Sequence, residues 1–235
     1  VETNLLSWTN EKSQIYKVNA DSGKDTEISE ELSGYLERLL KIAKDSDGAF
    51  DPTIGKLIRL WDIGGENQRI PGEDEIQEVL KDSGYQKISL DGNTIHMDEG
   101  CSLDLGAAGK GIGCDLILEN LKNQKDVTAA LMNLGGSSVM TYGSKPDGSS
   151  WNVAVTDPRA ENDDDYLGVV ALNGTEFLST SGDYEKYFIE DGVRYHHIMD
   201  PSTGYPAKSG VTGVTVVCDT GLEADALSTA CFVLG

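Results

Sequence analysis

The chain has 235 residues, of which 38% are hydrophobic, so it is long enough to bury a core without disulfide or metal crosslinks. Its formal net charge of −21 makes nucleic acid and anionic membranes poor partners, and a phosphorylated ligand would need a local cation. The four cysteines form no Cys-x-x-Cys pair, which argues against a zinc site and favours small buried side chains.

The first half of the chain is predicted to be mainly helical. Apolar residues at helical spacing predict a helix over Ser29–Asp47, and a second helix is predicted over Glu73–Ser83. The alternating run 87–97 predicts a β-hairpin with a tight turn. A short buried strand is expected at 102–105, where four residues precede a glycine-rich segment.

The second half is predicted to be richer in strands. A helix should follow the glycine-rich turn and run through Leu121, and a last helix should start near Glu223. Strands are expected at 129–132, 151–155, 167–172, 187–190, 194–199 and 211–217. Helices first and strands later indicate an α+β fold with mixed or antiparallel sheets, and not a regular β-α-β alternation.

The segment Asp104–Gly111 could bind phosphate. A strand would feed a glycine-rich turn that opens a helix, where unpaired backbone N–H groups attract anions. Lys110 is the only basic residue between Asp98 and Leu118, so it could supply the cation that an acidic protein lacks. An ordinary strand-to-helix turn would give the same pattern, and turn chemistry equally explains the polar segments 133–138 and 179–183.

Two of the three histidines, His196 and His197, are adjacent at the end of a predicted strand. Neighbouring side chains on a strand face opposite ways, so only one of the two rings can face a given site. A metal held by both rings is therefore not expected. One histidine acting as an acid or base and two structural histidines remain equal alternatives.

In the last helix, Asp225 and Thr229 are four residues apart and share one face. A carboxylate and a hydroxyl in this arrangement offer hard oxygen ligands to Mg²⁺ or Ca²⁺. Acidic residues near a helix start also interact favourably with the helix dipole, so a purely structural explanation exists for the same residues.

Taken together and in this order, these segments resemble the ApbE family of FAD:protein FMN transferases, formerly described as thiamine-biosynthesis lipoproteins. The matching stretches lie at 5–7, 16–19, 47–55, 60–64, 104–111, 133–138, 179–183, 195–206 and 223–230. They cover nearly the whole chain. One departure is Gly109, where the family usually carries alanine, a change that loosens the loop and removes no functional group.

The resemblance implies a single α+β domain over 1–235, clipped at both ends relative to the family, with an FAD cleft between lobes. The residues implied to bind FAD are Asn19, Trp61, Asp62, Ile63, Asp104, Lys110 and Ile198, with Trp61 or its neighbours touching a ring. A metal ion, Mg²⁺ or alternatively Ca²⁺ or Mn²⁺, would be held by the carbonyl of Ala107 with Asp225 and Thr229. His197 matches the family histidine that is tied to activity.

The implied function is metal-dependent transfer of FMN from FAD to a Ser or Thr hydroxyl of a redox protein, with release of AMP. Asp225 and His197 would be the catalytic residues, and either His197 or a nearby carboxylate would take the hydroxyl proton. An FAD pyrophosphatase, which would use water as the acceptor, and an FAD-binding protein without turnover remain alternatives. The family resemblance also implies export, with anchoring as a lipoprotein at the outer face of a bacterial membrane.

Overall fold

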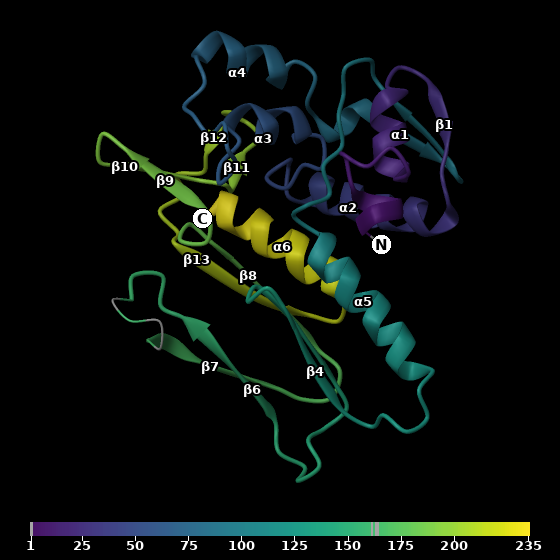
Figure 1. Cartoon of the computed structure of the whole chain (residues 1–235), viewed down its shortest axis with the longest axis vertical. Coiled ribbons are helices and arrows are strands. Elements are labelled where there is room, and N and C mark those ends of the chain that lie inside the picture. Colours follow the sequence, from purple (N-terminus) through teal and green to yellow (C-terminus); the bar gives the residue numbers. More distant parts are fainter. Residues whose placement is uncertain (1, 161, 163–164) are drawn as a thin grey trace.

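The computed structural model describes residues 2–160, 162 and 165–235 (Figure 1). Its N-terminal part combines short helices with a small antiparallel sheet of strand order β1-β3-β2. The elements of this part are a π-helical turn η1 (Glu2–Leu6), α1 (Gln14–Ala20), β1 (Asp25–Glu27), α2 (Glu30–Asp45), α3 (Gly55–Trp61), α4 (Glu73–Leu80), a 3₁₀ turn η2 (Tyr85–Lys87), β2 (Ile88–Asp91) and β3 (Thr94–Met97).

The rest of the chain is built around a four-stranded antiparallel sheet of order β13-β8-β5-β4. Two helices, α5 and α6, contact this sheet, and the hairpin β6–β7 packs against it through a separate apolar cluster (Figure 1). The elements are α5 (Gly109–Lys122), β4 (Ala130–Leu134), β5 (Ser138–Tyr142), β6 (Trp151–Thr156), β7 (Tyr166–Leu172), β8 (Phe177–Gly182), β9 (Tyr187–Glu190), β10 (Val193–His196), β11 (Met199–Asp200), β12 (Tyr205–Pro206), β13 (Gly213–Cys218) and α6 (Gly221–Leu234).

Helix α6 lies at the centre of the molecule. It contacts the sheet on one side and α5 and α2 on the other, so apolar residues cover nearly its whole circumference. The starts of α5 and α6 cross at Gly111 and Gly221, where a Cβ atom on either glycine would overlap the backbone of the other. This close approach brings the first turn of α5 against α6, and it sets the position of the polar residues described below.

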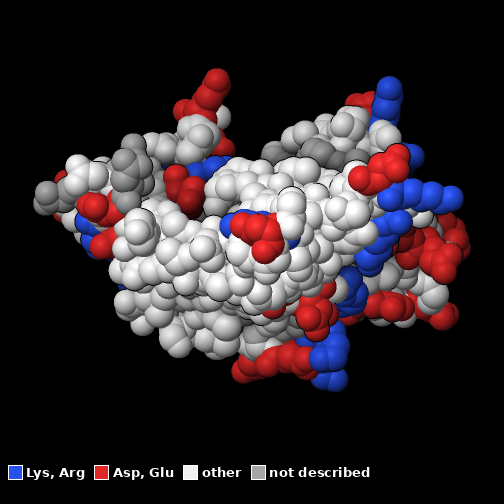
Figure 2. Space-filling model, turned by 90° about the horizontal axis from the view of Figure 1, so that it is seen from below, with Lys and Arg blue, Asp and Glu red and all other residues white. Residues whose placement is uncertain are grey.

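Charge is unevenly distributed over the surface. Seen from below, the side of the molecule that carries β6–β7 is mostly uncharged over its middle, while charged side chains gather toward one end (Figure 2). Strand β7 exposes the side chains of Tyr166, Leu167 and Val169. Among the described helices, none is both long enough and apolar enough to cross a bilayer.

Most of the predicted elements are present. The helix over Ser29–Asp47 is α2, and the Ser29 hydroxyl caps it by accepting the Leu32 N–H at 3.2 Å. The hairpin at 87–97 is β2–β3, and the helix predicted to end at Ser83 ends three residues earlier. The α+β fold with antiparallel sheets and flanking helices is confirmed.

Two predictions about strands were wrong, and two strands were not predicted. The segment 102–105 is extended, but it forms only one bridge, between Ser102 and Ile54. The strand predicted over 194–199 is interrupted, because β10 ends at His196 and β11 starts at Met199. The two inner strands β5 and β8 were not predicted, because their Ser- and Thr-containing sequences are also typical of turns.

Candidate functional site

Asp225 is a buried carboxylate at the junction of α6, α5 and the sheet. One oxygen accepts the backbone N–H of Gly111 at 2.6 Å, and the other accepts the hydroxyls of Ser138 and Ser179, both at 2.7 Å. Burial raises the pKa of Asp225, while these hydrogen bonds and the charge of Lys110 oppose the rise. The three donors and the charge of Lys110 thus favour the charged form of this buried carboxylate.

Lys110 lies next to this carboxylate, in the first turn of α5. Its ammonium group donates a hydrogen bond to the hydroxyl of Ser137, and its side chain lies beside Gly135. The charge of Lys110 affects the pKa of both Asp225 and His197, so the three groups share one region although they come from three distant segments. The glycine-rich start of α5 therefore carries an exposed cation next to the buried carboxylate.

A pocket of about 230 Å³ opens at the same glycine-rich turn. Its lining consists of Leu6, Trp8, Asp104, Leu105, Gly106, Gly109 and Lys110. Trp8 is partly exposed, and the guanidinium of Arg59 lies 4.9 Å from its ring centroid. Sequence reasoning missed Trp8, although it directly follows the matching stretch 5–7 and an exposed aromatic residue beside a motif is a usable signal.

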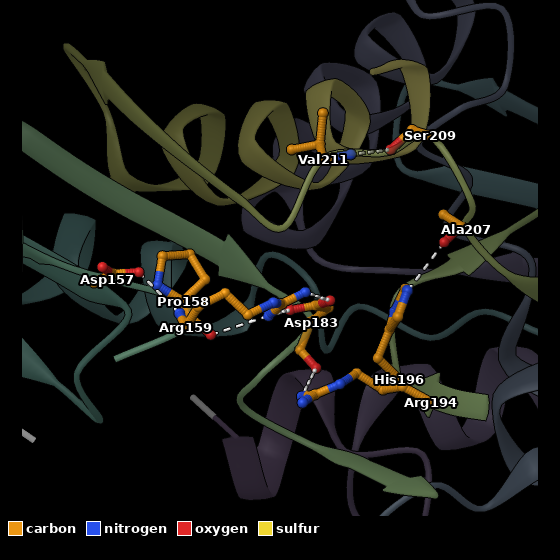
Figure 3. A network of polar contacts seen from close by, with 9 residues as sticks. All are labelled: Asp157, Pro158, Arg159, Asp183, Arg194, His196, Ala207, Ser209 and Val211. Atoms are coloured by element: carbon orange, nitrogen blue, oxygen red, sulfur yellow. Dashed lines mark hydrogen bonds and ion pairs between the residues drawn. The ribbon is translucent and has the colours of Figure 1, made fainter. Parts of the chain in front are cut away.

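The two adjacent histidines have different environments. His196 is buried, packs edge-on against Phe232, and uses both ring nitrogens: Nε2 donates to the Ala207 carbonyl at 3.0 Å, and Nδ1 accepts the Ile198 N–H at 3.3 Å. Figure 3 shows the His196 ring directed at Ala207. Both ring nitrogens of His196 are hydrogen-bonded within the protein, so His196 is a structural residue.

His197 lies in the break between β10 and β11. Its Nδ1 contacts the Lys186 carbonyl at 3.2 Å, and because a carbonyl only accepts, Nδ1 must carry the proton. Burial, with smaller contributions from the charges of Lys186 and Lys110, lowers the pKa of His197 to about 4, although the hydrogen bond to Lys186 opposes this shift. The ring is therefore neutral at pH 7, with Nε2 unprotonated and able to accept a proton.

Asn19 and Asp104 hold the backbone of the pocket. The Asn19 side chain forms two hydrogen bonds with the backbone of Leu103, at 2.9 and 2.7 Å. Asp104 accepts the Gly106 N–H at 2.7 Å, and its own N–H is bonded to the Pro52 carbonyl. Asp104 also lines the pocket, whereas the polar atoms of Asn19 are used to fix the neighbouring segment.

The position of Trp61 corrects the prediction that its side chain lines the FAD pocket. It is fully buried, its Nε1 donates to the Gly204 carbonyl at 2.9 Å, and its ring contacts those of Tyr195 and Tyr205. The ring has no exposed surface for a flavin. Contact with FAD from this segment would come from its neighbours Asp62 and Ile63, which are partly exposed at the end of α3.

Replacing Trp61 with phenylalanine should lower the free energy of unfolding by about 2 kcal/mol, since the buried Gly204 carbonyl loses its donor. FAD affinity should stay unchanged, because the ring lies in the core. Urea unfolding and a fluorescence titration with FAD would measure the two effects. A weakened affinity with unaltered stability would return Trp61 to the FAD pocket.

Ile198 is buried, and its backbone is used within the protein. Its N–H is bonded to Nδ1 of His196, and its carbonyl accepts the Ala207 N–H at 2.9 Å. A carbonyl oxygen has two lone pairs, so Ile198 retains only one backbone acceptor for a nucleotide. Its predicted backbone contact with FAD therefore depends on that one oxygen.

The predicted metal ligands offer only oxygen atoms. In the part of the chain that the structure describes, no three His, Cys, Asp or Glu side chains gather to hold a metal, and the predicted partners of Asp225 are a hydroxyl and a backbone carbonyl. Thr229 lies one helical turn after Asp225, and its hydroxyl is 3.4 Å from that of Ser181. The Ala107 carbonyl belongs to the exposed turn before α5. One buried carboxylate with hydroxyl and carbonyl oxygens suits a hard cation such as Mg²⁺.

Comparison with known proteins defines the class to which this arrangement belongs. The FAD:protein FMN transferase of Treponema pallidum is 35% identical over 98% of this chain and 67% of its own length. The enzyme of the same name from Klebsiella pneumoniae is 34% identical over 98% of this chain and 71% of its own length. The chain thus spans about two thirds of these curated relatives.

Solved structures agree. The ApbE protein of Thermotoga maritima is 39% identical with a TM-score of 0.90, covering 99% of this chain and 74% of the other. The apo form of the flavinyl transferase ApbE of Pseudomonas stutzeri is 34% identical with a TM-score of 0.85, covering 99% and 72%. A family model described as the ApbE family matches residues 2–235. The chain belongs to the ApbE family, which confirms the resemblance that its ordered motifs indicated.

Proposed function

We propose that the protein is an FAD:protein FMN transferase that uses a divalent metal to move FMN from FAD to a Ser or Thr hydroxyl of a redox protein. The observation that carries this proposal is the convergence of Asp225, Lys110 and His197 beside a glycine-rich turn, in a protein of net charge −21. The names of the relatives support the same activity.

Each residue of the site would have a separate role in the reaction. Lys110 and the glycine-rich turn would bind the pyrophosphate, which repels the rest of this acidic protein. The acceptor oxygen would attack the FMN phosphorus, its proton would pass to Nε2 of His197, and the bond to AMP would break. A divalent metal held by Asp225, Thr229 and the Ala107 carbonyl would, when bound, offset negative charge on the phosphate oxygens.

His197 suits the role of general base because its tautomer is fixed. The Lys186 carbonyl holds the proton on Nδ1, so Nε2 presents its lone pair. A pKa of about 4 makes the free ring a weak base, but an anionic pyrophosphate nearby would raise the pKa toward the working pH. Substrate binding would thereby activate the base.

The test is incubation with FAD and Mg²⁺, with and without a candidate acceptor protein that contains Ser and Thr. The expected products are AMP and an acceptor that carries covalent flavin fluorescence, and chelation of the metal should stop both. Free FMN and AMP without labelled acceptor would identify a pyrophosphatase instead. Binding of FAD without cleavage would contradict both enzymatic activities.

Replacing Lys110 with alanine should weaken FAD binding about tenfold, the order of magnitude of one charge-assisted contact to phosphate. Added salt should narrow the difference from the wild type, because the interaction is electrostatic and exposed. FAD titrations at two ionic strengths would measure this. Arginine at position 110 should restore most of the affinity, and equal affinities for wild type and the alanine variant would remove Lys110 from the phosphate site.

A further inference from the structure

Lys186 contacts His197 through its backbone. It lies in the connection between β8 and β9, and its carbonyl accepts both the backbone N–H of His197, at 3.1 Å, and the ring Nδ1, at 3.2 Å. These two contacts hold the segment that carries Lys186 against the break after β10. The side chain of Lys186 therefore starts next to the residue that we propose as the general base.

The Lys186 side chain also contacts the loop after α3. A Cβ atom on Gly64 would lie 3.6 Å from its Cδ, so its aliphatic part packs beside the loop that contains Asp62 and Ile63. Its charge lowers the pKa of His197 more strongly than that of Lys110 does. The side chain is exposed, and it extends from a backbone position in contact with His197 toward the loop after α3.

Neither Lys110 nor Lys186 forms an ion pair within the described residues. The ion pairs found there, up to 4.0 Å, involve other lysines and arginines and His96. Lys110 lies beside the buried Asp225 carboxylate, whereas Lys186 is exposed next to a neutral histidine. An anion bound beside His197 would be attracted by the positive charge of each lysine.

A polar network holds Asp183, three residues before Lys186 (Figure 3). Arg159 donates two hydrogen bonds to the Asp183 carboxylate, at 2.9 and 2.7 Å, and Arg194 donates one to its carbonyl at 3.3 Å. The Asp183 N–H is bonded to the Thr212 carbonyl. Because hydrogen bonds hold Asp183 on several sides, the backbone of Lys186, three residues later, has a defined position.

We propose that Lys186 is a second phosphate-binding residue, which acts with Lys110 to bind the pyrophosphate of FAD beside His197. This inference rests on the proposed function and identifies a further residue of the same site. The contact would supply positive charge at the phosphorus where the acceptor attacks, without any change in covalent chemistry. Lysine suits this role, because its flexible side chain can follow the anion from a defined backbone position.

The first experiment compares the Lys186→Gln variant with the wild type in titrations of FAD, riboflavin and inorganic pyrophosphate. FAD and pyrophosphate should bind about tenfold more weakly to the variant, and riboflavin, which has no phosphate, should bind equally well. Lys186→Arg should restore most of the lost affinity. Lys125→Gln, in an exposed loop after the far end of α5, is the matched control and should bind all three ligands as the wild type does.

The second measurement is the pKa of His197, followed by NMR of the ring C–H without any ligand. Lys186→Gln should raise this pKa, because one cation is removed while the backbone carbonyl contact stays. A purely structural role of Lys186 would leave the pKa unchanged. Lys110 and His196 also affect His197, so both must stay as in the wild type.

Equal binding of pyrophosphate and FAD by the wild type and by Lys186→Gln would overturn the assignment, as would an unshifted pKa of His197. A wild type that binds neither ligand would also overturn it. Failure of this assignment can be distinguished from failure of the proposed transferase function. A wild type that binds FAD through Lys186 but transfers no FMN would contradict the transferase activity and support the phosphate contact.

Discussion

Asp225→Ala should abolish metal-dependent cleavage of FAD, with a fall in turnover of about 10³-fold, while the protein stays folded. The carboxylate is the only acidic ligand in the proposed metal set, and alanine leaves neutral oxygens that hold Mg²⁺ weakly. Release of AMP at fixed Mg²⁺ would measure the loss. Raising the Mg²⁺ concentration should recover little activity, because no carboxylate replaces the missing one.

The loss of turnover in Asp225→Ala must be distinguished from a loss of folded protein. Alanine leaves the donors at Gly111, Ser138 and Ser179 without their acceptor, and each buried donor that finds no new partner costs about 1–3 kcal/mol. The same substitution removes the cost of burying a carboxylate, so the net loss should remain below the stability of a typical domain. Circular dichroism and thermal unfolding would show whether the variant is folded at the assay temperature.

Asp115→Asn is a matched control at the same helix junction. Burial raises the pKa of this second aspartate also, and it accepts the N–H groups of Gly221 and Leu222 at 2.7 and 3.0 Å. Its role is to cap α6, so the variant should unfold at lower temperature with turnover unchanged. Full turnover of Asp225→Ala at ordinary Mg²⁺ would rule out the proposed metal site.

Local structure was predictable wherever a short segment determines it. Helix α2 has both a helical apolar pattern and a serine cap, and the β2–β3 hairpin has an alternating pattern around a tight turn. The order of motifs also indicated the family, because each motif marks a turn or helix start of a defined type. These features need no information about distant parts of the chain.

Contacts between distant segments were not predictable from local pattern. Trp61 is buried because Tyr195, Tyr205 and Gly204, more than 130 residues later, cover it, and its own short helix does not show this. The donors to Asp225 from the inner strands depend on the sheet order and on the crossing of α5 and α6 at two glycines. Sequence placed the carboxylate on a helix, and only the fold surrounds it with hydroxyls.

The break at His197 has a similar origin. The sequence analysis predicts one continuous strand over 194–199. In the structure, Met199 and Asp200 instead pair with Tyr205 and Pro206 across a tight turn. The change of partner strand leaves His197 outside any ladder, where its ring can contact the Lys186 carbonyl.

His197→Ala should lower turnover about 10²–10⁴-fold, the usual contribution of a proton-transfer group, with little change in FAD affinity. The lost interaction exists only in the transition state, so kcat and kcat/KM should fall together. In the wild type, kcat/KM for FAD should decline only below about pH 4, where protonation removes the lone pair on Nε2. The decline of kcat at low pH should begin at a higher pH, because bound pyrophosphate favours the protonated ring. The His197→Ala variant should show neither decline.

His196→Ala is the matched control, and its expected result is the opposite. It removes two hydrogen bonds and the contact with Phe232, so the free energy of unfolding should fall by about 2–3 kcal/mol. Turnover per folded molecule should stay near that of the wild type, since both ring nitrogens already have protein partners. Urea unfolding and single-turnover cleavage of FAD, measured on both variants, separate the two roles. A loss of turnover at His196 with normal stability, together with an active His197→Ala, would assign the base to His196 and contradict the tautomer argument.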